Sequence, residues 1–293
     1  MTLRHMHIFI CVCDENNMTK AAARLHMTQP SVSLAIQELE QHYGIRLFER
    51  LGKRLFLADA GRKLLTYARH IVNLNEETER AMQDLGGISR LRIGASVTIG
   101  ESVLVDLLQY VDQNNPRQEV LSEIHNTAEL ENMLLKDELD LALVEGEIQS
   151  EYLVTEAFME DELVYVASAS SIFARDGLHV EDLPKTKFFI REQGSGTRDL
   201  FEQEMKEKQL KYKVAGIYNN AEAIKKAVEA GLGISVISKR AVRHEIRQGR
   251  LISFSLPETV FKRKFRMVYH KNKYLSPQLS QMMEICREID GIV

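Results

Sequence analysis

The chain has 293 residues, of which 44% are hydrophobic and 27% are charged. This composition is typical of a globular protein with one large or two ordinary domains, and it excludes a disordered or collagen-like chain. Three cysteines cannot build a disulfide framework and indicate a reducing compartment. Apolar runs stay below the roughly 18 residues of a membrane span, and the N-terminus lacks the apolar stretch of a signal peptide. A membrane protein and a secreted protein are therefore both disfavoured.

Charge is distributed unevenly along the chain. Residues 1–70 carry 10 Lys and Arg against 6 Asp and Glu, a net charge of +4, whereas residues 71–293 have a net charge of −8. A basic N-terminal part on an acidic remainder favours an anionic partner at the N-terminal part only. Chance surface charge is the alternative explanation.

The pattern over the first 58 residues predicts three short helices followed by a small β-hairpin. Apolar periodicity and an alanine-rich run place the helices at about 3–16, 18–26 and 29–43. Thr28 is placed to cap the third helix, Pro30 suits its first turn and Gly44 ends it. Residues 45–57 alternate loosely about a turn at 52–54, which indicates a two-stranded wing.

The second and third predicted helices have the arrangement of a helix-turn-helix motif. Small residues let two helices cross closely, and the second helix then presents its polar N-terminal residues to the DNA major groove. Gln29, Ser31 and Ser33 have side chains that can read base edges there. Cations suited to DNA phosphates stand at Lys20, Arg46, Arg50, Lys53 and Arg54. A small helical subdomain with a solvated basic face is the alternative.

A long helix is predicted from Ala60 to about Leu85, with a length of about 39 Å. Its seam falls at alternating steps of four and three residues: Leu64, Ala68, Ile71, Asn75, Thr78, Met82 and Leu85. Such a helix either pairs two subunits or packs against its own chain. Residues 86–89, Gly-Gly-Ile-Ser, predict a hinge and a domain boundary near residue 88.

Strands alternate with helices over the rest of the chain. The predicted strands lie at 91–95, 120–124, 140–144, 163–167, 188–190, 234–237 and 265–269. The predicted helices lie at 101–113, 127–135, 198–208, 221–230 and 278–288. This alternation predicts a parallel α/β architecture, and two clusters of strands suggest two subdomains.

Segments of this α/β part combine hydroxyl groups with helix starts. Ser96 and Thr98 stand where the first strand passes into a helix, and Thr127 begins the next helix in the same way. A flexible loop enters a further helix through Gly194, Ser195, Gly196 and Thr197. Hydroxyls and backbone N–H groups at helix starts suit an anion. Plain helix capping is the alternative for the first three, and a solvated turn is the alternative for the loop, where Arg198 could simply pair with Glu202.

The sequence resembles LysR-type transcriptional regulators over its whole length. The stretch MTKAAARLHMTQPSVSLAIQELEQHYGIRLFER, with LGKRLFLADAG after it, resembles their DNA-binding half. The segments LRIGASVTIGESVLVDLLQYV, DLALVEG and GLGISVIS resemble parts of their effector domain.

The resemblance implies an N-terminal all-α winged helix-turn-helix domain over residues 1–58 and a linker, or dimerisation, helix with its hinge over 59–88. An α/β effector domain like periplasmic binding proteins should follow over 89–293. Its subdomain I should comprise about 89–161 with 266–293, and its subdomain II about 162–265. Gln29, Pro30 and Ser33 match family positions that meet bases. Leu34 and Ala35 replace the common Arg and Gln, so the resemblance leaves the promoter preference open.

The implied function is that of a bacterial, cytoplasmic, sequence-specific regulator that binds double-stranded promoter DNA as a homodimer or homotetramer. RNA polymerase is a candidate partner, and no cofactor, metal or membrane is expected. Hydroxyl-bearing segments match the effector cleft between the subdomains, which should hold a small anion. ASVTIGE and EQGSGTR most resemble members linked to sulfur and anion metabolism. Sulfite, sulfate and a small carboxylate are therefore the expected effectors.

Two other classes of protein fit the sequence less well. An enzyme would need a nucleophile with an activating base, and Cys286 stands in no such motif. The run Gly231-Leu232-Gly233 lacks the full dinucleotide-binding fingerprint. A solute-binding protein would explain the α/β part but not the first 70 residues.

Overall fold

The computed structural model describes residues 1–51, 54–83, 90–116 and 118–289. It divides into two compact units, one made mainly of residues 1–87 and one made mainly of residues 88–293. Within the described ranges, no helix is both long enough and apolar enough to cross a membrane.

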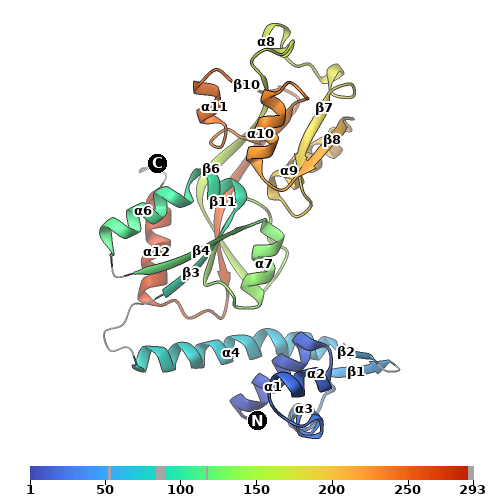
Figure 1. The fold of residues 1–293 in the computed structure, drawn as a ribbon, viewed down its shortest axis with the longest axis vertical. Helices are drawn as coiled ribbons and strands as arrows, with labels where there is room; N and C mark the ends of the chain where they lie inside the picture. The colour runs from blue at the N-terminus through green and yellow to red at the C-terminus, as the bar shows by residue number, and fades with distance from the viewer. Residues whose placement is uncertain (52–53, 84–89, 117, 290–293) are drawn as a thin grey trace. The chain divides into compact units, whose positions relative to one another are not determined.

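The first unit contains three short helices, a hairpin and a long helix (Figure 1). These elements are α1 (Leu3–Glu15), α2 (Met18–Arg24), α3 (Gln29–Tyr43), β1 (Phe48–Leu51), β2 (Arg54–Leu57) and α4 (Asp59–Gln83). The Asn17 side chain accepts hydrogen bonds from the first turn of α2, and Thr28 accepts one from the Ser31 N–H of α3. Gly44 ends α3 at φ 65°, a left-handed conformation that favours glycine. The predicted helices and wing are confirmed.

Small side chains allow the helices of the first unit to pack closely. Ala21 and Ala22 of α2 are 0% and 3% exposed, and the Cys11 thiol of α1 lies against the Ala21 carbonyl. Cys11 and Cys13 are buried free thiols. The helix-turn-helix arrangement therefore rests on one shared apolar core.

The seam along α4 is divided between two environments. Ala68 is fully buried in the core of the first unit, and Leu64 packs against that core. Further along, Ile71 is 42% exposed and Met82 is 69% exposed, beside Leu74 at 48%. The first part of the seam therefore packs on its own chain, and the second part leaves apolar surface uncovered. Leu85 and the predicted hinge lie outside the described residues.

The second unit has a seven-stranded sheet and a separate two-stranded sheet. The large sheet contains β3 (Arg90–Ser96), β4 (Glu119–His125), β5 (Leu141–Val144), β6 (Leu153–Ser168), β9 (Ser235–Ser238), β10 (Leu251–Phe254) and β11 (Phe261–His270). Its order is β10-β6-β11-β5-β3-β4, and β9 also pairs with β6. The small sheet pairs β7 (Lys187–Arg191) with β8 (Lys213–Tyr218) in parallel.

Helices surround both sheets (Figure 1). They are α5 (Val97–Ser102), α6 (Leu104–Asn114), α7 (Thr127–Leu135), α8 (Phe173–Asp176), α9 (Gly196–Glu207), α10 (Ala221–Glu229), α11 (Arg243–Arg247) and α12 (Pro277–Glu288), with a 3-10 turn at Val180–Asp182. The helix predicted over 101–113 is two helices, because the backbone breaks at Val103 with φ −137°.

The large sheet is mixed, which corrects the prediction of a parallel architecture. Strand β3 lies parallel to β4 and β5, but β6 pairs antiparallel with β9, β10 and β11. The sequence pattern also missed β8, β10 and the first half of β6, since these segments are mostly exposed or half-buried and carry a weak apolar signal.

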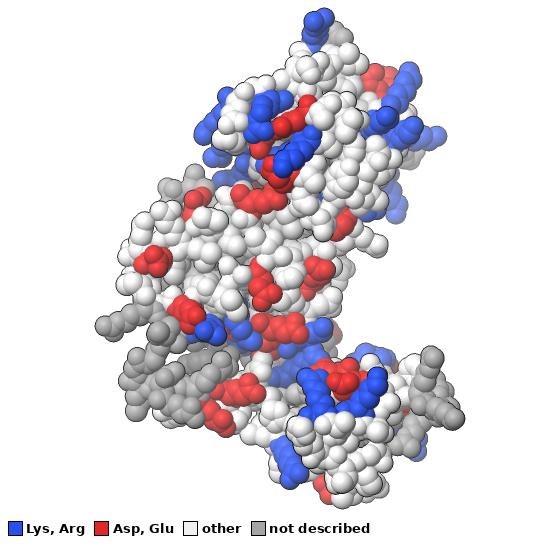
Figure 2. All heavy atoms as spheres, in the orientation of Figure 1, with Lys and Arg blue, Asp and Glu red and all other residues white. Residues whose placement is uncertain are grey.

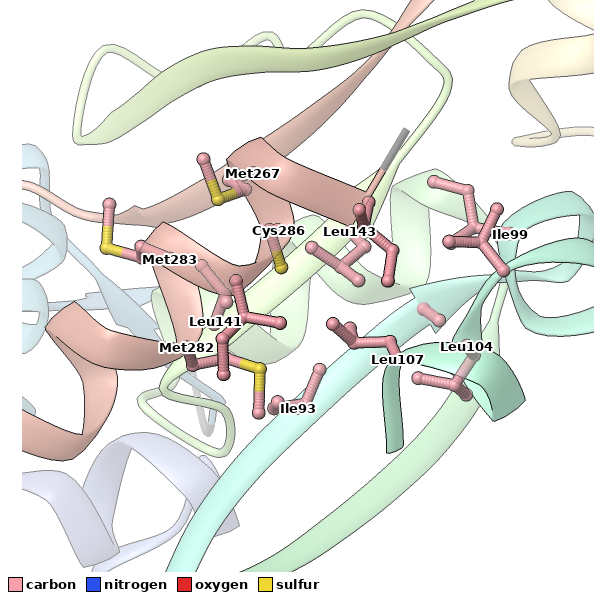
Figure 3. Packing of buried hydrophobic residues seen from close by; sticks show 14 of the residues in the cluster. Ile93, Ile99, Leu104, Leu107, Leu141, Leu143, Met267, Met282, Met283 and Cys286 are labelled. Carbon is pink, nitrogen blue, oxygen red and sulfur yellow. The ribbon is translucent and has the colours of Figure 1, made fainter. Parts of the chain in front are cut away.

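Two of the apolar cores of the second unit lie along the long strands β6 and β11. One core gathers Ile93, Leu107, Leu141 and Met267 with residues of α12 (Figure 3). The other gathers Tyr165, Phe188, Phe201 and Phe261. Met159 and Phe265 belong to the first core, whereas Leu163 of β6 belongs to the second. We call the halves around them subdomain I and subdomain II, and the predicted domain limits stay a prediction.

Candidate functional site

The start of α3 presents the residues predicted to meet DNA bases. Gln29, Pro30 and Ser31 are exposed, and Ser33 is half-buried. The Ser31 hydroxyl lies 2.8 Å from the Thr28 hydroxyl, which also accepts from the Ser31 N–H and so fixes the entry to the helix. This surface therefore offers an amide and hydroxyls on a rigid helix, the groups that read base edges.

The two positions that depart from the family pattern differ in their exposure to solvent. Leu34 is 55% exposed on the same surface of α3, whereas Ala35 is 7% exposed in the core. Only Leu34 is therefore placed to contact a base, and its side chain offers apolar contact without a hydrogen bond.

The predicted phosphate contacts are described only in part. Lys20 on α2 and Arg46 before β1 are exposed. Arg50 and Arg54 belong to β1 and β2, but their side chains, and Lys53 altogether, lie outside the described residues. Lys20 and Arg46 are available to DNA phosphates on the described surface.

The hydroxyl residues predicted for the effector site converge in the second unit. Ser96, Thr98, Thr127, Ser195 and Thr197 are each no more than 5% exposed. The Thr98 and Thr197 hydroxyls, which are 99 positions apart in the chain, lie 3.4 Å from each other. Together with two charged residues described below, Glu145 and Arg263, we call this set the polar cluster.

Glycines allow the segments of the polar cluster to touch. A Cβ placed on Gly196 would lie 2.5 Å from both the Cα and the N of Gly146, closer than real Cβ atoms approach. A Cβ on Gly146 would lie 2.9 Å from the Thr127 hydroxyl. The Gly194 carbonyl accepts a hydrogen bond from the Ala128 N–H at 3.3 Å. The Gly194–Thr197 loop is therefore a packed contact and not a solvated turn.

Glu145 is the acidic member of the polar cluster. Its Oε1 accepts a hydrogen bond from the Thr98 hydroxyl at 3.1 Å, and the residue is 5% exposed. Burial raises the pKa of its carboxyl, while the nearby Arg263 and Arg191 guanidinium groups act in the opposite direction. Glu145 is therefore protonated to the neutral carboxylic acid more readily than a glutamate in water.

Arg263 is the basic member, and it joins β11 to α9. Its Nε donates to Asp161 at 2.7 Å, and its Nη1 donates to the Thr197 hydroxyl at 2.9 Å. Ser238 donates to the other oxygen of Asp161 at 2.7 Å. Both side chains of the pair are almost completely buried, at 4% and 1% exposed, so the charges depend on these bonds in place of water.

Several polar atoms of the cluster have no hydrogen-bond partner among the described residues. They are Ser96 Oγ, Thr127 Oγ1, Ser195 Oγ, Glu145 Oε2 and Arg263 Nη2. Buried polar atoms are normally paired, and an unpaired one costs about 1–3 kcal/mol. Ser96 and Ser195 precede α5 and α9 but make no side-chain capping bond. Helix capping therefore does not account for these hydroxyls, and a small polar ligand would satisfy them.

Arg198 behaves differently from its neighbours in the same loop. Its Nε donates to Glu202 at 2.8 Å, the i,i+4 pair that was the alternative to a ligand contact. In contrast, no role in the site was predicted from the sequence for Glu145, Arg263 or Asp161. The sequence did contain a signal that Arg263 is buried. In a strand, Arg263 lies on the same side as Phe261 and Phe265, and the structure buries all three residues. Glu145 directly follows the fully buried strand β5, at an edge where ligands commonly bind in α/β sheets.

Comparisons with known proteins match both units. Residues 3–62 match the family model for the bacterial regulatory helix-turn-helix protein of the lysR family, and residues 86–290 match that for the LysR substrate binding domain. An uncharacterised HTH-type transcriptional regulator of Escherichia coli, YeiE, is 31% identical, covering 98% of this chain and 97% of that protein.

Solved structures share the fold over most of the chain. A full-length OxyR variant from Pseudomonas aeruginosa has a TM-score of 0.67 at 21% identity, covering 98% of this chain and 94% of the other. The regulatory domain of CcmR from Synechocystis PCC6803, solved in complex with 2-PG, has a TM-score of 0.64 at 25% identity. It covers 69% of this chain and 97% of the other.

Proposed function

Because the chain belongs to the LysR family of transcriptional regulators, we propose that a small anion bound in its polar cluster modulates its contacts with promoter DNA. Regulators of this family bind DNA and small effectors and form oligomers, and they are not enzymes. The observation that carries the proposal is a set of five polar atoms, buried in one cluster, that have no hydrogen-bond partner among the described residues.

The donors of the polar cluster favour an anionic effector. Three unpaired hydroxyls and the Nη2 of Arg263 can each donate a hydrogen bond. The first turn of α9, a helix of 12 residues, adds backbone N–H groups beside Ser195. The CcmR regulatory domain is a relative solved with a small ligand, 2-PG, which supports a ligand site in the equivalent domain here.

Glu145 narrows the chemistry of the effector. A bound anion and an ionised carboxylate repel each other, and a proton shared between them removes this repulsion. Glu145 can supply this proton, since burial raises its pKa, or the effector can bring it. Sulfite, which is partly protonated near neutral pH, and a carboxylate with a hydroxyl group meet this need. Sulfate brings no proton, so Glu145 would have to supply it.

For promoter DNA, we propose that α3 enters the major groove and that the wing contacts phosphates. Gln29, Pro30, Ser31 and Ser33 would meet the bases, while Lys20, Arg46, Arg50, Lys53 and Arg54 would meet the backbone. Affinity should fall with rising salt, because phosphate contacts release counterions.

The uncovered apolar residues of α4 support self-association. Ile71, Leu74 and Met82 are exposed at helical spacing in the single chain, and a second copy of α4 would cover them. We propose a homodimer or homotetramer on this basis. Promoter binding would place the protein in the cytoplasm, with RNA polymerase as a proposed partner at the promoter.

A thermal-shift screen of the full chain tests the effector site. Sulfite, sulfate and glycolate would be compared on the wild type, on Ser195→Ala and on the control Thr155→Ala, whose residue is exposed on β6. A ligand at 100 times its Kd adds about 2.7 kcal/mol of stability. Sulfite or glycolate should stabilise the wild type and the control but not Ser195→Ala. Equal stabilisation of all three proteins would contradict the proposed site.

A further inference from the structure

A cavity lies in the second unit. It has a volume of about 690 Å³ and is lined by β6, β10, β11, α11 and the segment between β9 and α11. We call it the basic pocket. Its lining residues are Glu160, Asp161, Glu162, Lys239, Arg240, Arg243, Ile246, Arg247, Ser253, Lys262, Arg263 and Lys264.

The long strands β6 and β11 lie between the two sites, and Arg263 of the polar cluster also contributes to the lining of the basic pocket. Lys262 lies opposite Glu162 in the register, and Lys264 lies opposite Glu160. These four residues are exposed or half-buried, whereas the intervening Asp161 and Arg263 are buried. Successive side chains of a strand point to opposite faces. The lysines therefore belong to one face of the strand pair, and the Arg263 guanidinium that holds Thr197 belongs to the other.

The basic pocket carries an excess of positive charge. Apart from the buried Arg263–Asp161 pair, six of its lining residues are Lys or Arg and two are Glu. Asp161 is already paired with Arg263, and Glu162 lies 3.4 Å from Lys239. Among the described residues, Arg243, Arg247, Lys262 and Lys264 have no ion-pair partner. Cations gathered in a concavity repel one another and concentrate anions.

The packing of α11 holds two of these cations at the basic pocket. Glu245, in the middle of the helix, is 5% exposed and accepts from Lys225 of α10 at 2.8 Å. With Glu245 turned inward, Arg243 and Arg247 are exposed one helical turn apart. Figure 2 shows Lys and Arg side chains gathered on the molecular surface around the place of α11 in Figure 1.

We propose that the basic pocket binds a compact anion that carries two or more phosphate groups. Its volume lies within the range of about 300–1,000 Å³ of small-molecule sites, and arginine guanidinium groups match the geometry of phosphate oxygens. The lining contains Ile246 as its one strongly apolar side chain and no aromatic side chain among the described residues. It therefore lacks a platform for a nucleobase, and the charged groups of the ligand supply the recognition.

Calorimetry on the full-length protein with inorganic pyrophosphate in about 0.15 M salt tests the proposal. Pyrophosphate should bind the wild type, and inorganic sulfate should bind at least tenfold more weakly because it has a single anionic group. Arg247→Gln on α11 and Lys262→Gln on β11 should each weaken pyrophosphate binding at least tenfold. Melting curves would establish that these exposed substitutions leave the fold intact.

Three control variants separate this pocket from other sites. Lys226→Gln replaces a cation that is 73% exposed on α10, Lys20→Gln alters the proposed DNA-binding surface, and Ser195→Ala alters the proposed effector site. All three should bind pyrophosphate as the wild type does. Absence of binding to the wild type, unchanged binding by Arg247→Gln and Lys262→Gln, or equal affinity for sulfate would overturn the proposal. Loss of binding in Ser195→Ala would assign pyrophosphate to the polar cluster and overturn it as well.

Discussion

The contact between Gly196 and Gly146 predicts a measurable cost for a single methyl group. In Gly196→Ala, the new Cβ would lie 2.5 Å from two backbone atoms of Gly146, whereas carbon atoms pack at about 3.5–4.0 Å. The segments would have to separate by about 1 Å or more. The Arg263–Thr197 bond of 2.9 Å and the 3.4 Å contact of Thr98 with Thr197 span the same contact and would lengthen with it.

The expected change in the free energy of unfolding combines a loss and a gain. Overpacking a closely packed site costs about 1–3 kcal/mol. Complete loss of a hydrogen bond to a charged group costs about 1.5–3 kcal/mol, and weakening the bond costs less. Alanine favours a helix over glycine by at most about 1 kcal/mol, and less in the first turn. We therefore expect a net loss of about 1–3 kcal/mol, with weaker binding of the effector.

Urea denaturation of Gly196→Ala, Gly146→Ala and the double variant measures this effect. If both methyl groups act by separating the same two segments, the double variant should lose less than the sum of the single losses. A Gly196→Ala protein as stable as the wild type, or more stable, would refute the reasoning, because helix propensity would then be the whole effect.

Three further predictions concern DNA, pH and assembly. Gln29→Ala should cost roughly 1–3 kcal/mol of binding free energy at the cognate site and much less on random DNA. Lys20→Ala should weaken binding to every sequence. Fluorescence titration measures both effects, and equal losses for Gln29→Ala on the two DNAs would exclude base readout. Burial raises the pKa of Glu145, so its stabilising contribution is present below the ordinary pKa of glutamate and is lost as pH rises through the raised value. Glu145→Gln should therefore be more stable than the wild type near pH 8 and lose this advantage towards about pH 4. Urea denaturation measures the difference in stability between the two proteins, and a difference that does not change with pH would contradict the raised pKa of Glu145. Ile71→Glu should shift the protein towards monomer in light scattering. The same substitution at the exposed Val105 of α6 should leave the mass unchanged. An unchanged mass for Ile71→Glu would argue against α4 as the interface.

Local sequence determined the elements of the first unit and the positions of the hydroxyl residues. Asn17, Thr28 and Gly44 act on backbone groups within a few residues, so the limits of α2 and α3 could be predicted from the chain alone. Ser96 and Ser195 directly precede helices, which is also a local property. The wing followed from alternation about one turn, because the strands of a hairpin are neighbours in sequence.

Only the tertiary structure decided which distant groups meet, because strand pairing depends on partners that local sequence does not specify. Strand β11 pairs with β5 and β6 and so carries Arg263 to Asp161, which lies 102 positions away. The same pairing makes the sheet mixed and gives Lys262 and Arg263 different faces of the strand pair. Glu145 follows a predicted strand, but its burial beside Thr98 and Arg263 comes from the packing of both subdomains around it. The sequence could therefore name the hydroxyls of the polar cluster, while the charges that define its chemistry emerged from the packing.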